Sequence, residues 1–290
     1  MNGIVQIKYG KVREIIKNLN QMDLDQADFD HIKKQIGYLM TGLQMKMVTP
    51  HKDSRLYRGV IYKEKPTKTN FLGYPPATLI TDFQRCNSPG NSMFYCSVDP
   101  SAVYYELGVR PGDKVYVSKW SVLQDFFLNR IAPRDEDETD DLVGGVVLTF
   151  FETKFSQPIH ETYSSQYKIT SAISEKMTSG KLMDEHRILG GLTYPSVTHP
   201  NRSENVAIRA AVVDQFLHLD YVEEILIADV QGKNISYTCT DFSSKFDGGN
   251  IVWTGKPLHW TMAPGAMLTV KAESDGWVAR DENGNIVNPG

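Results

Sequence analysis

Apolar residues recur three or four positions apart in two groups between residues 9 and 44, and a polar break near Asp23 separates the groups. This spacing predicts two amphipathic helices, because residues three and four apart lie on one face of a helix. Asp28 is placed to cap the second helix. The region shows no cluster of chemically reactive side chains in its sequence, so we expect residues 1–52 to form an N-terminal helical appendage for packing or oligomerisation. The recurring apolar residues are Ile15, Ile16, Leu19, Ile32, Ile36, Leu39 and Leu43.

The spacing of apolar residues changes after this region, where short runs rich in β-forming residues replace the helical pattern. Residues 55–61 alternate in polarity and predict a strand, with Leu56 facing opposite to Tyr57. Another strand is predicted over residues 190–195, ending at a turn just before Ser196. Helical segments interleave with the strands, so we expect an α+β domain over residues 53–290 with a β-rich C-terminal extension. Further strands are predicted at residues 114–117, 223–228 and 235–240 and around 251–253 and 267–270, and further helices at 122–128, 163–177 and 204–216.

One stretch carries three chemically capable side chains within a short length of chain. Polar, turn-rich residues from Arg85 to Ser92 lead into a short apolar strand that contains Tyr95. That strand passes almost at once into a predicted helix over residues 99–107, which carries Glu106 near its end. A turn, strand and helix in this order would bring Arg85, Tyr95 and Glu106 to one edge of a sheet. Such a convergence of polar groups is typical of a ligand pocket.

The residue types in this stretch, together with Arg58 in the preceding predicted strand, suit a nucleotide. Two arginines favour an anionic ligand, because guanidinium groups match phosphate oxygens bidentately. A tyrosine can stack on a planar ring while its hydroxyl stays hydrogen-bonded. An isolated carboxylate such as Glu106 can stabilise the positive charge that develops when a glycosidic bond breaks. In NAD the nicotinamide leaves as a neutral group and needs no general acid, so we expect NAD as the ligand.

Charge and composition narrow the class of partner. The chain has 31 lysines and arginines against 35 aspartates and glutamates, a formal net charge of -4, so we expect no nucleic-acid partner. No apolar run approaches the length of a membrane span, and the first residues show no apolar signal region. The three cysteines are odd in number and lack metal-binding or CxxC spacing. These features predict a cytoplasmic protein with reduced thiols and no membrane partner.

Two other chemistries have candidate residues but weaker support. A cysteine nucleophile needs an activating histidine, and no histidine is tied by a recognisable motif to Cys86 or Cys96. A metal site needs ligands grouped at a characteristic spacing. The acidic run at residues 135–141 is dense with like charges and predicts a solvated loop, and residues 184–186 lack a second pair of ligands. We therefore predict neither thiol catalysis nor a metal site.

With these residues the chain resembles the RES-domain proteins, a family of NAD-consuming bacterial toxins named for Arg, Glu and Ser. Segments that match the family occur in its order between residues 55 and 217, and the N-terminal helices and C-terminal extension lie outside the resemblance. The resemblance implies a fold similar to diphtheria-toxin-like ADP-ribosyltransferases, with a split β-sheet core and surrounding helices. The matching segments are residues 56–58 for the Arg, 85–95 for the loop, 101–106 for the Glu, and 194–196 followed by 205–207 for the Ser.

The resemblance also implies which residues take part in the reaction. Glu106 would be the catalytic carboxylate. Arg58 would hold the diphosphate and ribose of NAD, and Ser196 would orient the substrate or the carboxylate. These three residues form the expected catalytic group.

Four further residues are expected to bind NAD. By the same resemblance, Arg85 would share the diphosphate and ribose with Arg58. Tyr95 would pack against the nicotinamide end of the ligand. Tyr57 and Asn205 are candidates for the pocket wall.

The resemblance implies an enzyme that cleaves the nicotinamide–ribose bond of NAD, of glycohydrolase or phosphorylase type, acting as a toxin or defence effector. The sequence leaves the acceptor of the ADP-ribose group open among water, phosphate and protein, so a protein ADP-ribosyltransferase is one alternative. A non-catalytic NAD-binding sensor or interaction module is another. The N-terminal helices are expected to bind an antitoxin, another regulatory protein or a second copy of the chain.

Overall fold

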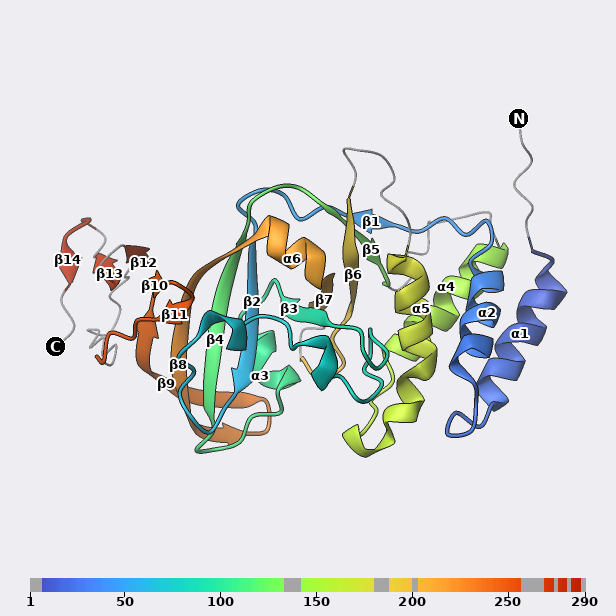
Figure 1. Ribbon diagram of the computed structural model, residues 1–290, viewed down its shortest axis with the longest axis horizontal. Coiled ribbons are helices and arrows are strands. Elements are labelled where there is room, and N and C mark those ends of the chain that lie inside the picture. Colours follow the sequence, from blue (N-terminus) through green and yellow to red (C-terminus); the bar gives the residue numbers. More distant parts are fainter. Residues whose placement is uncertain are drawn as a thin grey trace. The chain divides into compact units, whose positions relative to one another are not determined.

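The structure is a computed structural model that describes residues 7–132, 142–179, 188–199, 203–256, 269–273, 276–280 and 283–287. Helices and strands both contribute, so the chain has the mixed α+β architecture that the sequence predicts (Figure 1). Within these residues every helix is too short or too polar to cross a membrane. The chain divides into two compact units, each assembled from three segments of sequence. Unit 1 consists of Met1–Ser54, Tyr74–Tyr95 and Val122–Leu217, and unit 2 consists of Arg55–Gly73, Cys96–Ser121 and His218–Gly290.

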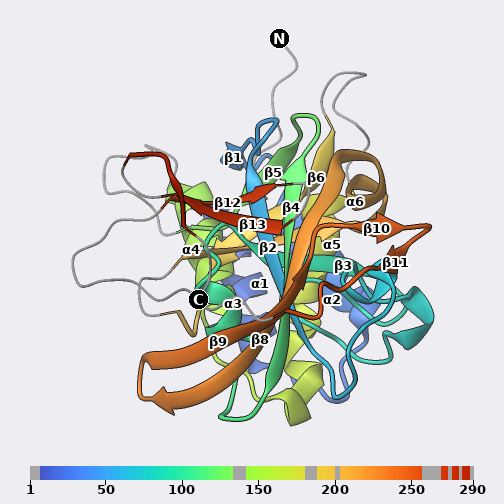
Figure 2. The same ribbon diagram turned by 90° about the vertical axis from the view of Figure 1, so that its left-hand side faces the viewer.

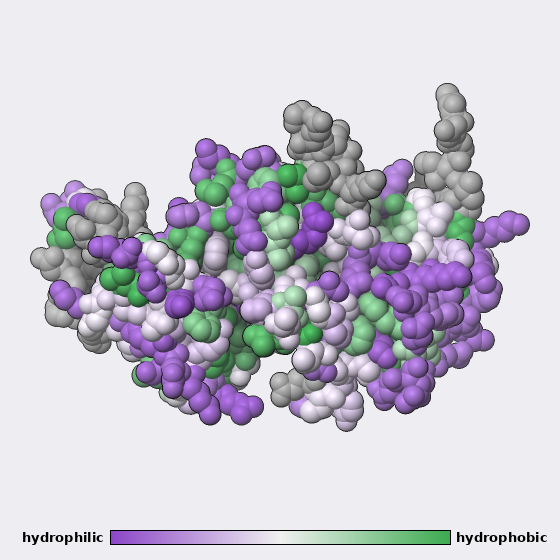
Figure 3. All heavy atoms as spheres, in the orientation of Figure 1, coloured by the Kyte–Doolittle hydropathy of each residue, from purple (hydrophilic) through white to green (hydrophobic). Residues whose placement is uncertain are grey.

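A group of helices in unit 1 lies side by side (Figure 1). These helices are α1 (Tyr9–Gln21), α2 (Phe29–Leu39), α4 (Leu142–Phe155) and α5 (Lys168–Thr178). The first two confirm the predicted pair, and the carboxylate of Asp28 caps α2 by accepting from the N–H groups of Asp30 and His31, at 3.3 and 3.2 Å. Most of the helix predicted at residues 163–177 is α5, which follows a 3-10 helix (Glu161–Tyr167). The outer surface over α1 and α2 is mostly hydrophilic, as amphipathic helices require (Figure 3).

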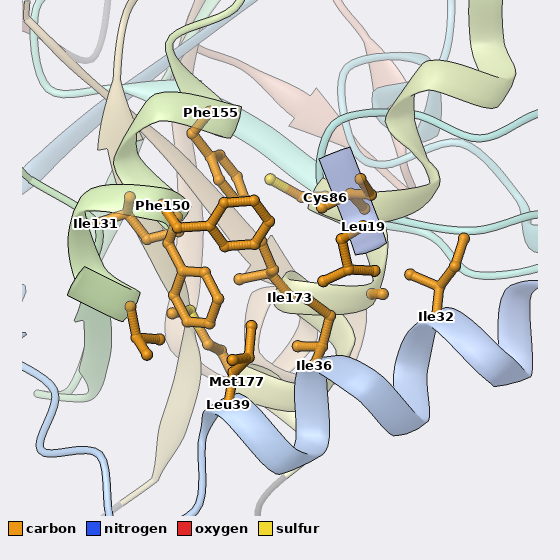
Figure 4. Packing of buried hydrophobic residues seen from close by; sticks show 14 of the residues in the cluster. Leu19, Ile32, Ile36, Leu39, Cys86, Ile131, Phe150, Phe155, Ile173 and Met177 are labelled. Carbon is orange, nitrogen blue, oxygen red and sulfur yellow. The ribbon is translucent and has the colours of Figure 1, made fainter. Parts of the chain in front are cut away.

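The apolar faces of these helices meet in the main hydrophobic cluster of unit 1 (Figure 4). Leu19 of α1, Ile36 of α2 and Ile173 of α5 are each no more than 1% exposed, and Phe155 at the end of α4 is fully buried. Truncating one such aliphatic side chain to alanine typically costs about 2–5 kcal/mol. Helices α1 and α2, expected as an appendage over residues 1–52, thus contribute directly to the core of unit 1.

The main strands of unit 1 follow the order β1-β5-β6-β7. Strands β5 and β6 are parallel, whereas β1 pairs antiparallel with β5 and β7 pairs antiparallel with β6. Gly191 permits the close approach of β6 to β7, since a Cβ atom there would lie 1.9 Å from the carbonyl oxygen of Ala207. The elements are β1 (Met47–Val48), β5 (Phe127–Arg130), β6 (Leu189–Pro195), β7 (Glu204–Arg209), helix α6 (Ala210–Phe216) and a 3-10 helix (Ala77–Leu79).

Two helices predicted for this unit are wrong in whole or in part. Residues 122–128 form no helix, because Val122 is the last residue of a strand and Phe127 begins β5. Of residues 204–216, only the second half is helical, and the first half is strand β7 with four consecutive buried residues. A strand buried on both faces is apolar without alternation, so over a few residues its pattern cannot be distinguished from that of a helix.

The main strands of unit 2 follow the order β2-β4-β8-β9. Strand β2 has the predicted bounds and pairs antiparallel with β4 along its whole length. Strands β8 and β9 form a long antiparallel hairpin (Figure 2). The strands predicted at residues 114–117, 223–228 and 235–240 are confirmed, and each is longer than predicted. The four are β2 (Arg55–Ile61), β4 (Lys114–Val122), β8 (Leu217–Gln231) and β9 (Asn234–Ser243).

Shorter elements complete unit 2. Strand β10 pairs with β11, and β12, β13 and β14 form a separate three-stranded antiparallel sheet. The strand predicted around residues 251–253 ends at Ile251, and the one predicted around 267–270 is described only from Thr269 onward. The elements are a 3-10 helix (Thr69–Phe71), β10 (Phe246–Asp247), β11 (Asn250–Ile251), β12 (Thr269–Glu273), β13 (Gly276–Arg280) and β14 (Ile286–Val287).

Candidate functional site

The residues predicted for an NAD site are divided between the two units. Strand β3 (Met93–Ser97) contributes its first three residues to unit 1 and its last two to unit 2, and helix α3 (Ala102–Glu106) follows in unit 2. The predicted succession of turn, strand and helix in this stretch is therefore confirmed. Unit 1 contains Arg85, Tyr95, Ser196 and Asn205, and unit 2 contains Tyr57, Arg58 and Glu106.

Tyr57 and Arg58 are neighbours in β2 and so point to opposite faces of the strand. Helix α3 covers the face that carries Tyr57. Gly59 lies on that same face, and a Cβ atom added there would lie 2.2 Å from Cγ1 of Val103. Arg58 projects from the other face. A pocket on one face of β2 can therefore include only one of these two predicted side chains.

Arg58 lies in β2, between strands β3 and β4. Tyr57 pairs with Ser97, which aligns Arg58 with Cys96 across the two strands. Burial raises the pKa of the Cys96 thiol, and the positive charge of Arg58 acts against this shift. The carbonyl oxygen of Arg58 accepts a hydrogen bond from Ser118 Oγ at 3.1 Å. The guanidinium thus projects from a strand that is held on both sides.

Glu106 is the last residue of α3, and its side chain is exposed. Two tyrosines anchor this short helix to the β8–β9 hairpin. The ring of Tyr104 stacks on that of Tyr237 with centroids 4.9 Å apart, and the hydroxyl of Tyr105 donates to the carbonyl oxygen of Lys233 at 2.6 Å. Because α3 is held at two points, Glu106 presents its carboxylate from a fixed position at the surface of unit 2.

The guanidinium of Arg85 is engaged within unit 1. Its Nη1 donates to the carbonyl oxygen of Phe155 at 2.6 Å, and both Nη atoms donate to that of Gln157, at 3.3 and 3.2 Å. The guanidinium carbon lies 5.3 Å from the centre of the Tyr167 ring. Since α4 ends at Phe155, Arg85 satisfies carbonyl groups at a helix C-terminus, where positive charge is favourable. Arg85 therefore has a structural role that joins the turn to α4.

Hydroxyl groups of α5 tie the turn around Arg85 to unit 1. Ser171 Oγ donates to the carbonyl oxygen of Gln84 at 2.6 Å, and Ser174 Oγ donates to that of Cys86 at 2.8 Å. These buried hydroxyls satisfy carbonyl groups that a turn cannot satisfy by itself. The turn is consequently held in place by a helix that comes much later in the sequence.

The hydroxyl of Tyr95, a residue of β3, forms hydrogen bonds with two residues of this turn. It donates to Oδ1 of Asn87 at 2.5 Å and accepts from the N–H of Cys86 at 3.0 Å. Burial of the hydroxyl raises the pKa of Tyr95 well above its usual value. The residue as a whole is only half-buried, so its ring keeps some surface for a ligand while the hydroxyl stays bonded within the protein.

Ser196 follows β6 directly, as predicted. Its Oγ accepts a hydrogen bond from the N–H of His199 at 2.9 Å, and its own N–H donates to the carbonyl oxygen of Ser203 at 2.8 Å. Asn205 lies opposite Tyr194 in the ladder between β6 and β7. Ser196 is 5% exposed and Asn205 6% exposed. The structure thus brings these two buried polar residues together at one end of the β6–β7 pair.

The alternative chemistries gain little from the structure. All three cysteines are free, as predicted. Burial raises the pKa of Cys86 and of Cys239 to about 12, and raises that of Cys96 as well, so none supplies a reactive thiolate near neutral pH. In the described part of the chain, no three His, Cys, Asp or Glu side chains gather closely enough to hold a metal ion. The acidic run at residues 135–141 and the triplet at 184–186 lie outside the described residues.

Glu223 of β8 is a candidate functional residue that the sequence patterns did not reveal. Burial raises its pKa from 4.5 to about 7, and the described residues offer it no hydrogen bond or ion pair. Burial also raises the pKa values of Tyr57, Tyr104 and Tyr221, and the nearby charge of Glu223 adds to each shift. Titratable groups whose pKa is shifted by burial occur often at functional sites. The one sequence signal of Glu223 is its position two residues after Tyr221 in β8, which places the two side chains on the same face of the strand.

An ion-pair network in unit 2 was also not predicted. Lys65 Nζ lies 2.6 Å from Oδ2 of Asp241, 3.1 Å from Oε2 of Glu224 and 4.3 Å from the ring centre of Trp253. Burial by itself would raise the pKa of both carboxyl groups, but hydrogen bonds from threonine hydroxyls and the charge of Lys65 outweigh it and lower both values. The network fastens the segment after β2 to strands β8 and β9, so its role is structural.

No model of a protein family matches the chain, and no curated protein matches it either. Functional assignment therefore depends on the residues and the geometry described above. In unit 1, Ser196 follows β6 directly, and Asn205 lies opposite Tyr194 in the β6–β7 ladder. In unit 2, Arg58 projects from one face of β2, whereas α3, which ends at Glu106, covers the other face.

Proposed function

We propose that this protein is an NAD-degrading enzyme that cleaves the nicotinamide–ribose bond, with the split-sheet core of the ADP-ribosyltransferase-like RES-domain proteins. One observation carries the proposal. Residues 85–106 fold as a pinned turn, strand β3 and helix α3, and Glu106 is exposed at the end of that anchored helix. The resemblance to RES-domain proteins requires this succession, which supports Glu106 as the catalytic carboxylate.

The proposed chemistry needs few groups from the protein. When the glycosidic bond breaks, its electron pair goes to the ring nitrogen, so the nicotinamide leaves neutral and the ribose gains oxocarbenium character. The Glu106 carboxylate would hold the ribose hydroxyls and stabilise that developing charge. Arg58 would bind the diphosphate. Because the Nη atoms of Arg85 already bond to carbonyl oxygens, we assign Arg85 to positioning the turn and contributing positive charge.

NAD turnover tests the proposal directly. Purified protein incubated with NAD should release nicotinamide, which liquid chromatography separates from NAD. Removal of a group that stabilises transition-state charge typically costs about 100-fold or more in rate, and we expect at least this loss for Glu106→Gln. Glu64→Gln is the matched control, because Glu64 is another exposed carboxylate of unit 2. Absence of release by the wild type, or equal release by Glu106→Gln, would overturn the proposal.

The two faces of β2 offer a second test of the same site. If the diphosphate binds on the Arg58 face, Arg58→Ala should raise KM for NAD while Tyr57→Phe leaves it unchanged. The reverse pattern would move the site to the face that α3 covers. Both variants are compared by thermal unfolding, so that a loss of activity is separated from a loss of folded protein.

The acceptor decides which type of NAD-degrading enzyme this is. Hydrolysis yields free ADP-ribose, and a phosphorylase requires inorganic phosphate and yields a phosphorylated ADP-ribose. A protein ADP-ribosyltransferase instead leaves label from adenine-labelled NAD bound to protein. Reactions with and without phosphate, followed by precipitation of protein, distinguish the three outcomes.

A non-catalytic NAD sensor is the second candidate, and one observation favours it. The polar groups of Arg85 and Tyr95 are already bonded within unit 1, Arg85 to the end of α4 and Tyr95 to the turn, which suits a rigid binding surface as well as a catalytic one. Saturable NAD binding without product after long incubation would support this alternative.

As a cytoplasmic toxin or defence effector, the enzyme should instead arrest bacterial growth when expressed. Glu106→Gln should relieve that arrest, as should a cognate antitoxin.

A further inference from the structure

Helix α4 is apolar around most of its circumference, although one side of it faces solvent. Its core side carries Val147 and Phe151, which belong to the main cluster of unit 1. On the outer side, Leu142 is 62% exposed and Val146 is half-buried. A helix that is apolar on every side is normally covered on every side. The outer side of α4 therefore has the character of an interface.

The polar residues on this outer side do not make it hydrophilic. Thr149 and Thr153 continue the row of exposed positions on α4. The hydroxyl of Thr149 donates to the carbonyl oxygen of Gly145 at 2.9 Å, and that of Thr153 donates to the carbonyl oxygen of Thr149 at 2.7 Å. With the hydroxyls bonded to the helix backbone, the donors are used and the methyl groups are left for contact with another surface.

A groove of about 380 Å³ runs between α1 and this side of α4. Ile16 of α1 and Val146 of α4 are half-buried and supply its apolar surface. Arg13 and Lys17, one helical turn apart on α1, line it with exposed positive charges. Asn20 and Gln21 complete the lining with uncharged polar groups. The groove thus combines an apolar floor with a positively charged rim.

Among the residues that the structure describes, no side chain neutralises the positive charge of this rim. Glu14, the nearby carboxylate on α1, pairs with Lys11 at 2.9 Å. Neither Arg13 nor Lys17 forms an ion pair with any residue that the structure describes. Arg13 lies with its guanidinium carbon 5.9 Å from the centre of the Tyr9 ring, a contact that orients it. Two cations that stand beside an apolar groove favour an occupant with carboxylates flanking apolar side chains.

We propose that the α1–α4 groove binds an amphipathic acidic helix of a partner protein. Helix-in-groove recognition uses apolar anchors three and four residues apart, which would lie on Ile16 and Val146. Carboxylates beside these anchors would pair with Arg13 and Lys17. A second copy of the chain fits less well, because a two-fold interface at this groove would set its cationic rim against the same rim of the other copy.

The probe that tests the proposal is a fluorescein-labelled helical peptide with leucines on one face and glutamates along both sides of that face. Fluorescence anisotropy with the full chain should show saturable binding that weakens as salt concentration rises. A peptide of the same composition in scrambled order should not bind. Arg13→Glu combined with Lys17→Glu should weaken binding on the order of tenfold or more, and should create binding to a peptide with lysines in place of glutamates.

A matched control separates the effect of the groove residues on binding from the effect of net charge. Lys34→Glu combined with Lys52→Glu makes the same change in charge at exposed positions that do not line the groove, and it should leave binding unchanged. Failure of the wild type to bind, equal binding of the scrambled peptide, or no effect of reversing the rim charges would overturn the proposal. So would a dimer in sedimentation that Val146→Asp converts to a monomer, because the groove would then hold a second copy. Binding seen only after the acidic residues 135–141 are neutralised would also overturn it.

Discussion

The carboxyl group of Glu223 should make the stability of unit 2 depend on pH. Burial raises its pKa from 4.5 to about 7, so the folded protein holds this proton more tightly than the unfolded chain does. The contribution of Glu223 to the free energy of unfolding is therefore greatest below pH 4.5 and is lost as the pH rises through about 7. This pH dependence of stability is opposite in sign to that of a carboxylate stabilised by an ion pair.

The size of the effect follows from the two pKa values. The difference between a pKa of 4.5 and one of about 7 corresponds to about 3 kcal/mol in the free energy of unfolding. Glu223→Gln keeps the shape of the side chain and removes its titration. The variant should match the wild type near pH 4.5 and exceed it by up to about 3 kcal/mol near pH 8.5.

Urea denaturation followed by tryptophan fluorescence measures this difference. The four tryptophans of the chain all belong to segments of unit 2, so the signal reports on the unit that contains Glu223. Glu224→Gln is the matched control on the next residue. It should destabilise the protein at neutral pH, because it removes the charge that pairs with Lys65. A difference between Glu223→Gln and wild type that stays constant from pH 4.5 to 8.5 would contradict this prediction.

Three further substitutions test the packing of the two units. Gly191→Ala should lower the free energy of unfolding by about 3 kcal/mol in denaturant titrations, because the added Cβ would clash with the carbonyl oxygen of Ala207. Replacing a glycine in an open turn by alanine should lower it by less. Asp28→Ala should cost about 1 kcal/mol, while Asp28→Asn keeps the helix cap and most of the stability. Lys65→Met should lower the free energy of unfolding by about 3 kcal/mol at neutral pH and by less in acid, because it removes the cation that pairs with two buried carboxylates. A loss of the same size at every pH would contradict this prediction.

Elements with strong local signals were predicted well from the sequence. The pair α1 and α2 shows helical spacing on one buried face, and Asp28 begins α2 with the side chain that its N–H groups need. Strand β2 alternates in polarity over residues 55–61 and has those bounds in the structure. In the two helices the apolar residues are buried and most of the polar residues are exposed, so the order of apolar and polar residues shows the helical period.

The failed predictions occurred where burial comes from both sides. Strand β7 is covered on both faces, and residues 204–216 were therefore predicted as one helix although only the part from Ala210 is helical. Residues 122–128 were predicted as a helix, yet they connect β4 to β5, whose partners β1 and β6 lie far away along the chain. Pairing between distant segments decides such cases, and a local window of sequence does not contain it.

The order of residue types along the chain is enough to indicate which residues could carry chemistry, including Arg58, the turn that begins at Arg85, and Glu106 at the end of a helix. How these groups are used depends on the folded structure. It bonds the guanidinium of Arg85 to the end of α4, separates Tyr57 from Arg58 across β2, and half-buries Glu223, which raises the pKa of its carboxyl group. The physical reason is that hydrogen-bond partners and burial depend on residues far apart in sequence, whereas spacing along the chain determines only the local period.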